Sequence, residues 1–189
     1  MVVQVFKFPP YGGTDGKPVL VLGTRFQPGS DDKHYCKPTA VAVSKDTNSF
    51  FVSDGYCNSR IIKYGVTEEP GGKHQVRHQF SFSNVNISCF ARQVTKLLEW
   101  GKGAGPFTVT KHPASFNIPH GLALAEERDE LCVADRENGR VQCFTTAGQF
   151  TRSLQPEQFG SRIFSVAATP ANGQLQSWRT GEVQNPHYS

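Results

Sequence analysis

The stretch that decides the fold is residues 116–144, FNIPHGLALAEERDELCVADRENGRVQCF. It contains three short runs with the alternation of a half-buried strand, at 121–124, 131–134 and 140–144. An Asn-Gly pair at 138–139 separates the last two runs, and both residue types tolerate the positive φ of a hairpin turn. The stretch therefore predicts a small antiparallel sheet.

Two cysteines, Cys132 and Cys143, lie on opposite arms of the predicted hairpin. If the turn is centred between Glu137 and Asn138, the two cysteines face each other directly and are close enough to form a disulfide. A histidine, His120, lies at the head of the strand that precedes this hairpin. The sequence thus predicts a cross-linked hairpin with a histidine beside it.

The same pattern occurs once more, 80 or 81 residues earlier. The matching segments are PTAVAV (38–43) with PHGLAL (119–124), FVSD (51–54) with CVAD (132–135), and NSRIIKY (58–64) with NGRVQCF (138–144). One strand unit is therefore used twice.

Fragments of further copies flank this pair of units. Residues 2–8 resemble the last strand of a preceding unit, and residues 163–168 resemble the first strand of a following one. A repeated antiparallel unit of this size is typical of a propeller blade, and the period-2 alternation disfavours a helical solenoid. We predict an all-β, partial β-propeller with two complete blades and flanking strands.

The charge and the apolar runs of the sequence argue against some classes of function. The chain has 189 residues and a formal net charge of +4, and its basic residues are scattered rather than clustered. Such a charge does not favour nucleic-acid binding. No apolar run reaches the roughly 20 residues of a membrane span, and the first 30 residues lack the apolar core of a signal peptide.

The cysteines indicate an oxidising compartment. Four of the five lie two per repeat, at Cys36, Cys57, Cys132 and Cys143. No CxxC spacing is present, so a cysteine-based metal cluster is not expected. Disulfides in a sequence without a signal peptide lead us to expect a fragment of a longer protein.

The expected domain bounds follow from the repeats. Residues 1–170 form the partial propeller, with blades at about 36–65 and 94–150. Residues 75–93, which carry the unpaired Cys89, are interpreted as an insertion. Residues 171–189 are interpreted as an unmatched tail.

Three residues stand out as candidates for function, although each also has a purely structural interpretation. Tyr56 lies in the turn DGYCNSR, which is one residue longer than its counterpart and places a hydroxyl at a loop tip. A single histidine at a strand start, such as His120, is more often a hydrogen-bonded structural residue. The simplest interpretation of Arg136 is an exposed arginine in a turn. The other loop histidines have no ligand-like spacing: His34, His74, His78 and His112.

A family resemblance gives these residues a chemistry. The strings HYCKPTAVAV, FVSDGYCNSRII, FNIPHGLAL and LCVADRENGRVQCF resemble peptidyl-α-hydroxyglycine α-amidating lyase, the second catalytic half of peptidylglycine α-amidating monooxygenase. The resemblance covers about residues 3–73 and 94–168. It implies an NHL-type six-bladed propeller, a zinc-dependent lyase, and cleavage of peptidyl-α-hydroxyglycine to a peptide amide and glyoxylate.

The resemblance also implies roles for individual residues. His120 matches one of three zinc-binding histidines, and zinc can polarise the substrate hydroxyl as a Lewis acid. Tyr56 matches a proposed general base, whose phenol would need a pKa lowered by zinc or arginine. Arg136 matches an arginine that can hold the substrate carboxylate or stabilise the phenolate. The pairs Cys36–Cys57 and Cys132–Cys143 match the two family disulfides.

The chain departs from the family pattern in several places. The other two zinc histidines and the calcium ligands of the family lie in blades that this sequence does not contain. His187 lies in a different context, Asn-Pro-His-Tyr-Ser, and the role of Arg162 in Phe-Gly-Ser-Arg is open. We therefore expect this polypeptide, expressed alone, to be poorly stable and inactive, since a catalytic zinc needs about three protein ligands.

The remaining expectations concern partners. The resemblance implies an α-hydroxyglycine peptide as substrate, a monooxygenase domain in the parent protein, and a secretory or extracellular location. The alternative is a non-catalytic NHL-repeat segment used for protein binding. Zinc content separates the two, because binding alone needs no metal.

Overall fold

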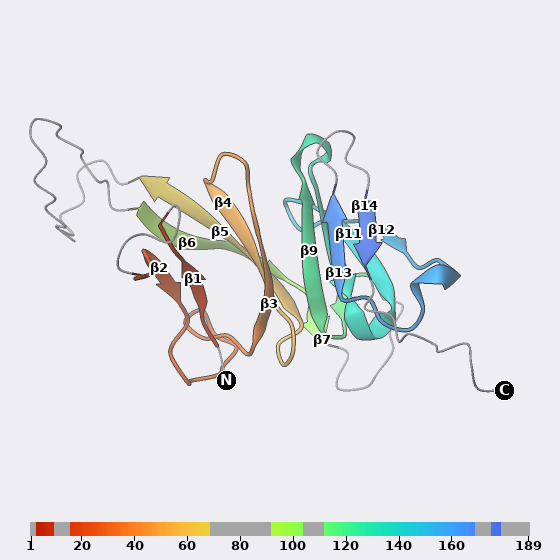
Figure 1. Cartoon of the computed structure of the whole chain (residues 1–189), viewed down its shortest axis with the longest axis horizontal. Coiled ribbons are helices and arrows are strands. Elements are labelled where there is room, and N and C mark those ends of the chain that lie inside the picture. The colour runs from red at the N-terminus through yellow and green to blue at the C-terminus, as the bar shows by residue number, and fades with distance from the viewer. Residues whose placement is uncertain (1–2, 10–15, 69–91, 104–111, 169–174, 179–189) are drawn as a thin grey trace, which may run out of the picture.

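The computed structural model describes residues 3–9, 16–68, 92–103, 112–168 and 175–178. These residues form four antiparallel sheets and one short parallel pair, joined by turns and short 3-10 helices (Figure 1). Within them, no helix has both the length and the apolar character needed to cross a membrane.

Two four-stranded sheets make up most of the described chain. The first has the order β3 (Pro38–Val43), β4 (Ser49–Asp54), β5 (Arg60–Glu68) and β6 (Arg92–Trp100). The second has the order β9 (Pro119–Ala125), β10 (Glu130–Asp135), β11 (Arg140–Thr145) and β12 (Phe150–Leu154). Both sheets are antiparallel meanders in chain order, as propeller blades are.

The smaller elements flank or connect these sheets. They are β1 (Val5–Lys7) with β2 (Leu20–Leu22), β13 (Ser165–Ala168) with β14 (Leu175–Trp178), the parallel pair β7 (Lys102–Gly103) and β8 (Ser115–Phe116), and the 3-10 helices η2 (Glu126–Arg128), η3 (Arg136–Asn138) and η4 (Glu157–Phe159).

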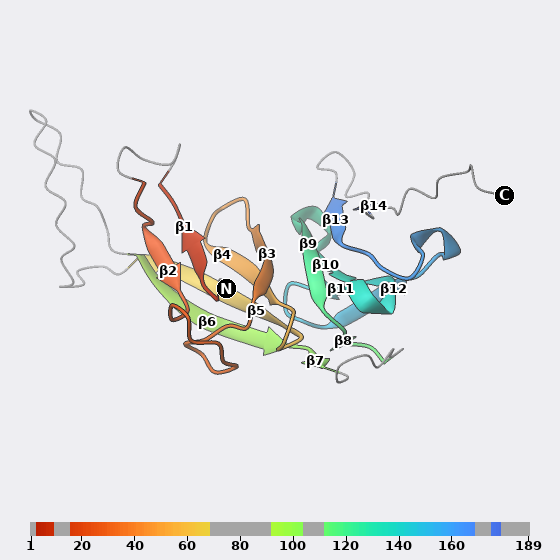
Figure 2. The same ribbon diagram turned by 60° about the horizontal axis from the view of Figure 1, so that its bottom comes forward.

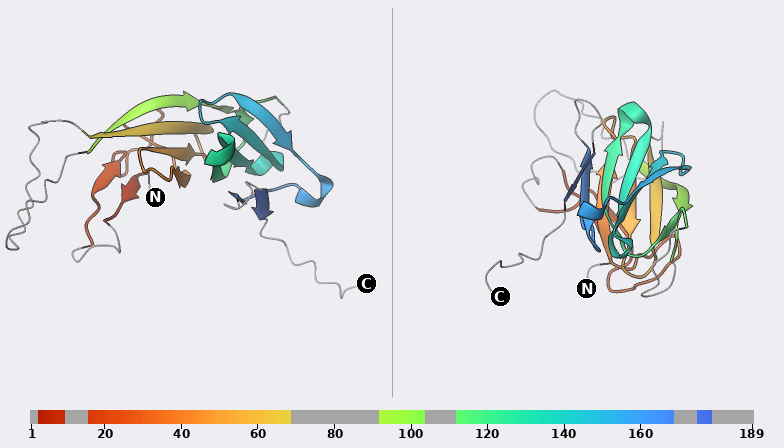
Figure 3. Two further views of the ribbon diagram at one scale, coloured as in Figure 1. Left: turned by 90° about the horizontal axis from the view of Figure 1, so that it is seen from above. Right: turned by 90° about the vertical axis from the view of Figure 1, so that its right-hand side faces the viewer.

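The sheets follow one another along an arc. Figure 3 (left) shows β6 on the outer side of this arc, and Figure 2 shows β1–β2 beside the first large sheet, the second large sheet beyond it, and β13 above β9 and β10. First strands of neighbouring sheets lie side by side, β3 against β9 and β9 against β13. The arc does not close on itself, so the predicted all-β, partial propeller is confirmed.

The observed strands correct the expected blade bounds. Residues 94–100 were assigned to the second blade, but they belong to β6, which pairs with β5 in the first sheet. The expected insertion at 75–93 is also too long by two residues, because Arg92 and Gln93 already pair with β5. The physical reason is that the backbone groups on the outer edge of β5 need a strand to pair with. That strand is β6, and a long segment separates it from β5 in the sequence. Most of this segment lies outside the described residues.

The expected tail at 171–189 also contains an ordered element. Leu175–Trp178 pairs with β13 as β14, and the rest of this segment lies outside the described residues.

Hydrophobic clusters join each sheet to the next. Between the two large sheets, Phe51 packs with Phe116 and Phe144, and Trp100 contacts both Phe51 and Phe144. The three phenylalanines are almost fully buried, and burial of such a side chain contributes roughly 1.5–3 kcal/mol each. Separate clusters join β1–β2 to the first sheet and β13 to the second. The blades are therefore held face to face by apolar side chains.

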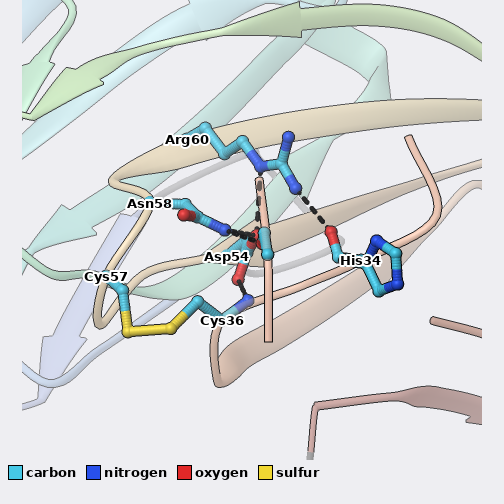
Figure 4. The surroundings of a disulfide bond; sticks show 7 residues. His34, Cys36, Asp54, Cys57, Asn58 and Arg60 are labelled. Atoms are coloured by element: carbon cyan, nitrogen blue, oxygen red, sulfur yellow. Dashed lines mark hydrogen bonds and ion pairs between the residues drawn. A yellow bond between two sulfur atoms is a disulfide. The ribbon is translucent and has the colours of Figure 1, made fainter. Parts of the chain in front are cut away.

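A buried aspartate closes the turn between β4 and β5 (Figure 4). The Asp54 carboxylate accepts hydrogen bonds from Arg60 Nε at 3.0 Å, from Asn58 Nδ2 at 2.6 Å and from the Cys36 backbone amide at 2.7 Å. Arg60 also donates to backbone carbonyls, including that of His34. Because Asp54 and Arg60 are nearly fully buried, these hydrogen bonds replace the water that neither side chain can reach.

The second large sheet repeats this arrangement. Asp135 accepts hydrogen bonds from Arg140 Nε and Asn138 Nδ2, both at 2.8 Å, and from the Asn117 amide at 2.8 Å. Gln142 Nε2 adds a bond at 3.1 Å. Burial raises the pKa of the Asp135 carboxyl, and the bonds from Asn138, Asn117 and Arg140 oppose this rise. An aspartate, an asparagine and an arginine thus fix the β4–β5 turn and the β10–β11 turn in the same way.

We expect Asp135→Ala to destabilise the chain by about 3–5 kcal/mol, because it leaves the Arg140 charge buried without its carboxylate. Unfolding in urea followed by circular dichroism measures the change. Glu157→Ala, at an exposed position, serves as the control and should change stability by about 0.5 kcal/mol or less. A loss below about 1 kcal/mol for Asp135→Ala would contradict the structural role of this pair.

Candidate active site

The candidate site lies where the β4–β5 turn, the β10–β11 turn and the head of β9 meet. Tyr56 lies at the tip of the first turn, Arg136 begins the second, and His120 is the second residue of β9. The match between the two repeats places both turns at the same end of their blades. Sequence reasoning predicted that these three side chains would converge, and the structure brings them together.

Tyr56 and Arg136 are in direct contact. Arg136 Nη1 donates a hydrogen bond to Tyr56 Oη at 3.1 Å, and the Arg136 guanidinium carbon lies 5.3 Å from the centre of the Tyr56 ring. Lys37 adds a second cation, with Nζ 5.6 Å from the same ring centre. The Tyr56 side chain is 44% exposed, so its hydroxyl can be reached from solvent. Two cationic side chains, Lys37 and Arg136, therefore lie beside the Tyr56 ring.

His120 also lies beside Tyr56. The two ring centres are 6.3 Å apart with the planes 71° from parallel. His120 Nδ1 lies 2.8 Å from the backbone carbonyl oxygen of Phe164. Because a carbonyl can only accept a hydrogen bond, the neutral imidazole carries its proton on Nδ1 and presents the lone pair of Nε2. This is the arrangement that proteins use to orient a metal-binding histidine.

Backbone contacts fix the position of these elements relative to one another. The Pro119 carbonyl accepts hydrogen bonds from Thr39 Oγ1 at 2.8 Å and Ser53 Oγ at 2.9 Å. A Cβ atom at Gly55 would lie 2.0 Å from that same carbonyl oxygen, so only glycine fits beside it. The turn that carries Tyr56 is therefore held against the residue that precedes His120.

The Cys36–Cys57 disulfide also anchors the turn that carries Tyr56. Its Cα atoms are 5.4 Å apart, and it ties the residue after Tyr56 to the start of the first blade (Figure 4). The structure also contains the Cys132–Cys143 disulfide, with Cα atoms 4.0 Å apart, between directly opposed residues of β10 and β11.

Two residues that sequence reasoning missed complete the surroundings of Arg136. Glu137 Oε1 accepts a hydrogen bond from Arg136 Nε at 2.7 Å, and its other oxygen accepts from Arg162 Nε at 3.1 Å. The Phe164 ring centre lies 5.1 Å from the Arg136 guanidinium carbon and 5.5 Å from the centre of the His120 ring. Phe164 matches His120 in the next repeat, which is the sequence signal that could have identified it.

The other candidate residues lie elsewhere. The Lys33 backbone amide and the His34 side chain, whose Nδ1 lies 2.7 Å from the Asp31 carboxylate, lower the pKa of Asp31. His112 Nδ1 lies 2.7 Å from the Pro113 carbonyl oxygen. The remaining histidines that were considered, His74, His78 and His187, lie outside the described residues.

A metal site needs several ligands close together. Within the described part of the chain, the one group of three possible ligand residues with atoms within 4.8 Å of one another is Glu130, Cys132 and Cys143. Its two sulfur atoms are joined in the disulfide, so they are not available as thiolates. Around His120, the described residues form no such group of possible metal ligands.

Comparison with known proteins agrees with this geometry. The NHL repeat family matches residues 116–144. The chain is 42% identical over 168 residues to peptidylglycine α-amidating monooxygenase from Rattus norvegicus, and 45% identical over 175 residues to peptidyl-α-hydroxyglycine α-amidating lyase 1 from Drosophila melanogaster. Over its aligned length, this chain belongs to the peptidyl-α-hydroxyglycine α-amidating lyase family.

The alignments cover 88% and 90% of this chain but only 14% and 27% of those two relatives. The chain therefore corresponds to a small part of each of these proteins. Among solved structures it is similar to U3-55K, with a TM-score of 0.50 and 14% identity, over 76% of this chain and 33% of that one. This likeness concerns the fold alone.

We expect His120 to be the Nδ1–H tautomer when neutral, because the Phe164 carbonyl accepts its proton. Nitrogen chemical shifts from imidazole ¹⁵N NMR distinguish the two tautomers, and His120→Gln identifies the signals by removing them. Finding the proton on Nε2 would contradict the proposed orientation of the ring.

Proposed function

We propose that this chain supplies part of the active site of a peptidyl-α-hydroxyglycine lyase, which converts a peptide ending in α-hydroxyglycine to a peptide amide and glyoxylate. The observation that carries this proposal is the contact of Arg136 with Tyr56 beside a histidine whose Nε2 is presented for a metal. Homology to named amidating lyases over most of the chain supports it.

Each of the three residues has a role in the reaction. Tyr56, as phenolate, takes the proton of the substrate hydroxyl. The electron pair left on that oxygen forms the carbonyl of glyoxylate, the carbon–nitrogen bond breaks, and the amide nitrogen takes up a proton. Arg136 stabilises the charge on Tyr56 Oη through the bond at 3.1 Å, and its remaining donors can bind the substrate carboxylate.

A zinc ion bound at His120 would act as a Lewis acid that polarises the substrate hydroxyl. Phe164 orients the imidazole for this task through its carbonyl oxygen. Calcium, which the family resemblance implies, has no assigned ligand in this chain. The two disulfides fit a secretory or extracellular location, because disulfides persist in oxidising compartments. A monooxygenase partner domain in the parent protein is supported by the name of the rat relative.

The proposal is tested in a chimera in which residues 36–165 replace the aligned segment of the rat relative. Glyoxylate release from an α-hydroxyglycine peptide is the measurement. We expect Tyr56→Phe to lower the rate about 100- to 10,000-fold, the usual contribution of a general base. Arg128→Ala, at an exposed position, is the control and should leave the rate unchanged. Equal rates for Tyr56→Phe and the unmodified chimera would refute the role of Tyr56.

For the 189-residue chain by itself, we expect no zinc-dependent glyoxylate release. A catalytic zinc needs about three protein ligands, and among the described residues His120 is the single histidine at the site. Turnover by this chain that Tyr56→Phe or His120→Ala abolishes would contradict the expectation. It would mean that another residue, such as His112 or His187, completes the metal site.

The alternative function, protein binding by a non-catalytic NHL-repeat segment, predicts that the chimera is inactive while it is folded and loaded with zinc. The same assay therefore decides between the two.

A further inference from the structure

The segment that leads into β13 packs against the turn that carries Arg136. The Ile163 amide donates a hydrogen bond to the Arg136 carbonyl oxygen at 3.3 Å, and the Ile163 side chain is buried. A Cβ atom at Gly139 would lie 2.7 Å from the Gly160 carbonyl oxygen, so this point of the turn has no room for a side chain. Arg162, the residue before Ile163, is therefore placed beside the turn.

The backbone of this turn is held without the Glu137 side chain. The Arg136 amide donates to the Ile118 carbonyl oxygen at 3.2 Å, and the Glu137 amide donates to the Asn117 carbonyl oxygen at 3.0 Å. The Gly139 amide bonds to the Arg136 carbonyl oxygen at 3.2 Å. The turn therefore does not need the Glu137 carboxylate in order to form, and the role of that carboxylate lies in what its two oxygens bind.

Glu137 divides its two oxygens between two arginines. Oε1 accepts a hydrogen bond from Arg136 Nε at 2.7 Å, and Oε2 accepts one from Arg162 Nε at 3.1 Å. A carboxylate beside a single guanidinium frequently forms two parallel hydrogen bonds with it. Because Arg162 occupies the second oxygen, Glu137 makes one hydrogen bond with Arg136 instead of two.

This single bond leaves both terminal nitrogens of Arg136 available at the candidate site. Nη1 donates to Tyr56 Oη at 3.1 Å, and among the described residues no atom accepts a hydrogen bond from Nη2. A carboxylate with both oxygens on this side of the guanidinium would take Nη2 as well as Nε. Arg162 therefore keeps Nη2 available for another partner beside Tyr56.

Arg162 also changes the net charge around Arg136. One carboxylate between two guanidinium groups leaves this group of three with one net positive charge, whereas Glu137 and Arg136 alone would be neutral. The side chains of Arg136 and Glu137 are only 15% and 20% exposed, so water screens their charges less than on an open surface. The remaining positive charge favours an anionic group beside Tyr56.

We propose that Arg162 is a positioning residue, which holds Glu137 on Arg136 Nε and thereby keeps Nη2 free to bind the carboxylate of the peptide substrate. This inference rests on the proposed lyase function, in which Arg136 binds that carboxylate. The Arg162 side chain is 61% exposed, and exposed ion pairs contribute little to stability. Loss of Arg162 should therefore affect substrate binding rather than folding.

The first test is the steady-state kinetics of the zinc-loaded chimera that carries residues 36–165. Arg162→Ala should raise KM about 10-fold, because a charge-assisted hydrogen bond to the substrate is lost, and should change kcat less than about twofold. Arg162→Lys, which keeps a charge and a donor, should keep KM within about twofold of the unmodified chimera. A fall in kcat with an unchanged KM would overturn the proposal.

The matched control is Arg128→Ala. Arg128 is also an exposed arginine near a glutamate, Glu130, but it lies at the opposite end of β10 from the Arg136 turn. Its loss should leave kcat and KM unchanged. The midpoint of urea unfolding should be the same for Arg162→Ala and the unmodified chimera. A lowered midpoint with an unchanged KM would show a purely structural role for Arg162 and would overturn the proposal.

A double-mutant cycle separates positioning from direct contact with the substrate. A glutamine has a single acceptor oxygen, so it cannot form two parallel hydrogen bonds with Arg136. In a Glu137→Gln background, Arg162→Ala should therefore change KM by less than about twofold. An equal increase of KM in both backgrounds would show that Arg162 acts on the substrate itself, which contradicts the positioning role.

Crystal structures of the chimera with and without Arg162→Ala give a readout that needs no catalysis. We expect Glu137 Oε2 to lie beside Arg162 in the unmodified chimera and within hydrogen-bond distance of Arg136 Nη2 in the variant. A Glu137 that keeps its single bond to Nε in the variant would overturn the proposal. A folded, zinc-loaded chimera that releases no glyoxylate would instead refute the lyase function, so the two failures are distinguishable.

Discussion

The buried pairing of an aspartate with an arginine across each blade turn is the interaction on which the rest of the site depends. Asp54 ends β4 and binds Arg60 at the start of β5, and Asp135 binds Arg140 in the same way between β10 and β11. Each pair closes a turn whose tip must face solvent, so the turn cannot be held by apolar packing. Charge-assisted hydrogen bonds in a buried environment fix it instead.

This constraint connects fold to chemistry. With both turns fixed, Tyr56 and Arg136 are presented from neighbouring blades at a hydrogen-bonding distance. Glu137 and Phe164 also contact the arginine, and the Phe164 carbonyl sets the tautomer of His120. Both partners belong to turns or strand heads that the repeat places at one end of the blades. The site is therefore built from equivalent positions of successive repeats, each carrying a different side chain.

The same repetition explains the two ends of the arc. A blade buries its two faces against its neighbours, so β1–β2, with two strands among the described residues, covers only part of the first large sheet. Val41 and Val43 are exposed for this reason, whereas the matching Leu122 and Leu124 are packed. The apolar clusters between blades and the exposure of these two valines are thus two results of one packing rule.

The sequence by itself determined the strand units, the resemblance of the two turns, the face-to-face placement of Cys132 and Cys143, and the candidates Tyr56, His120 and Arg136. These features are local or repeat at a fixed spacing, so periodicity and motif comparison can find them. The assignment of β6 could not be predicted, because pairing across a long intervening segment leaves no local signal. The roles of Phe164 and Arg162 required the tertiary structure, because their contacts with His120, Arg136 and Glu137 join segments that meet only when the blades pack.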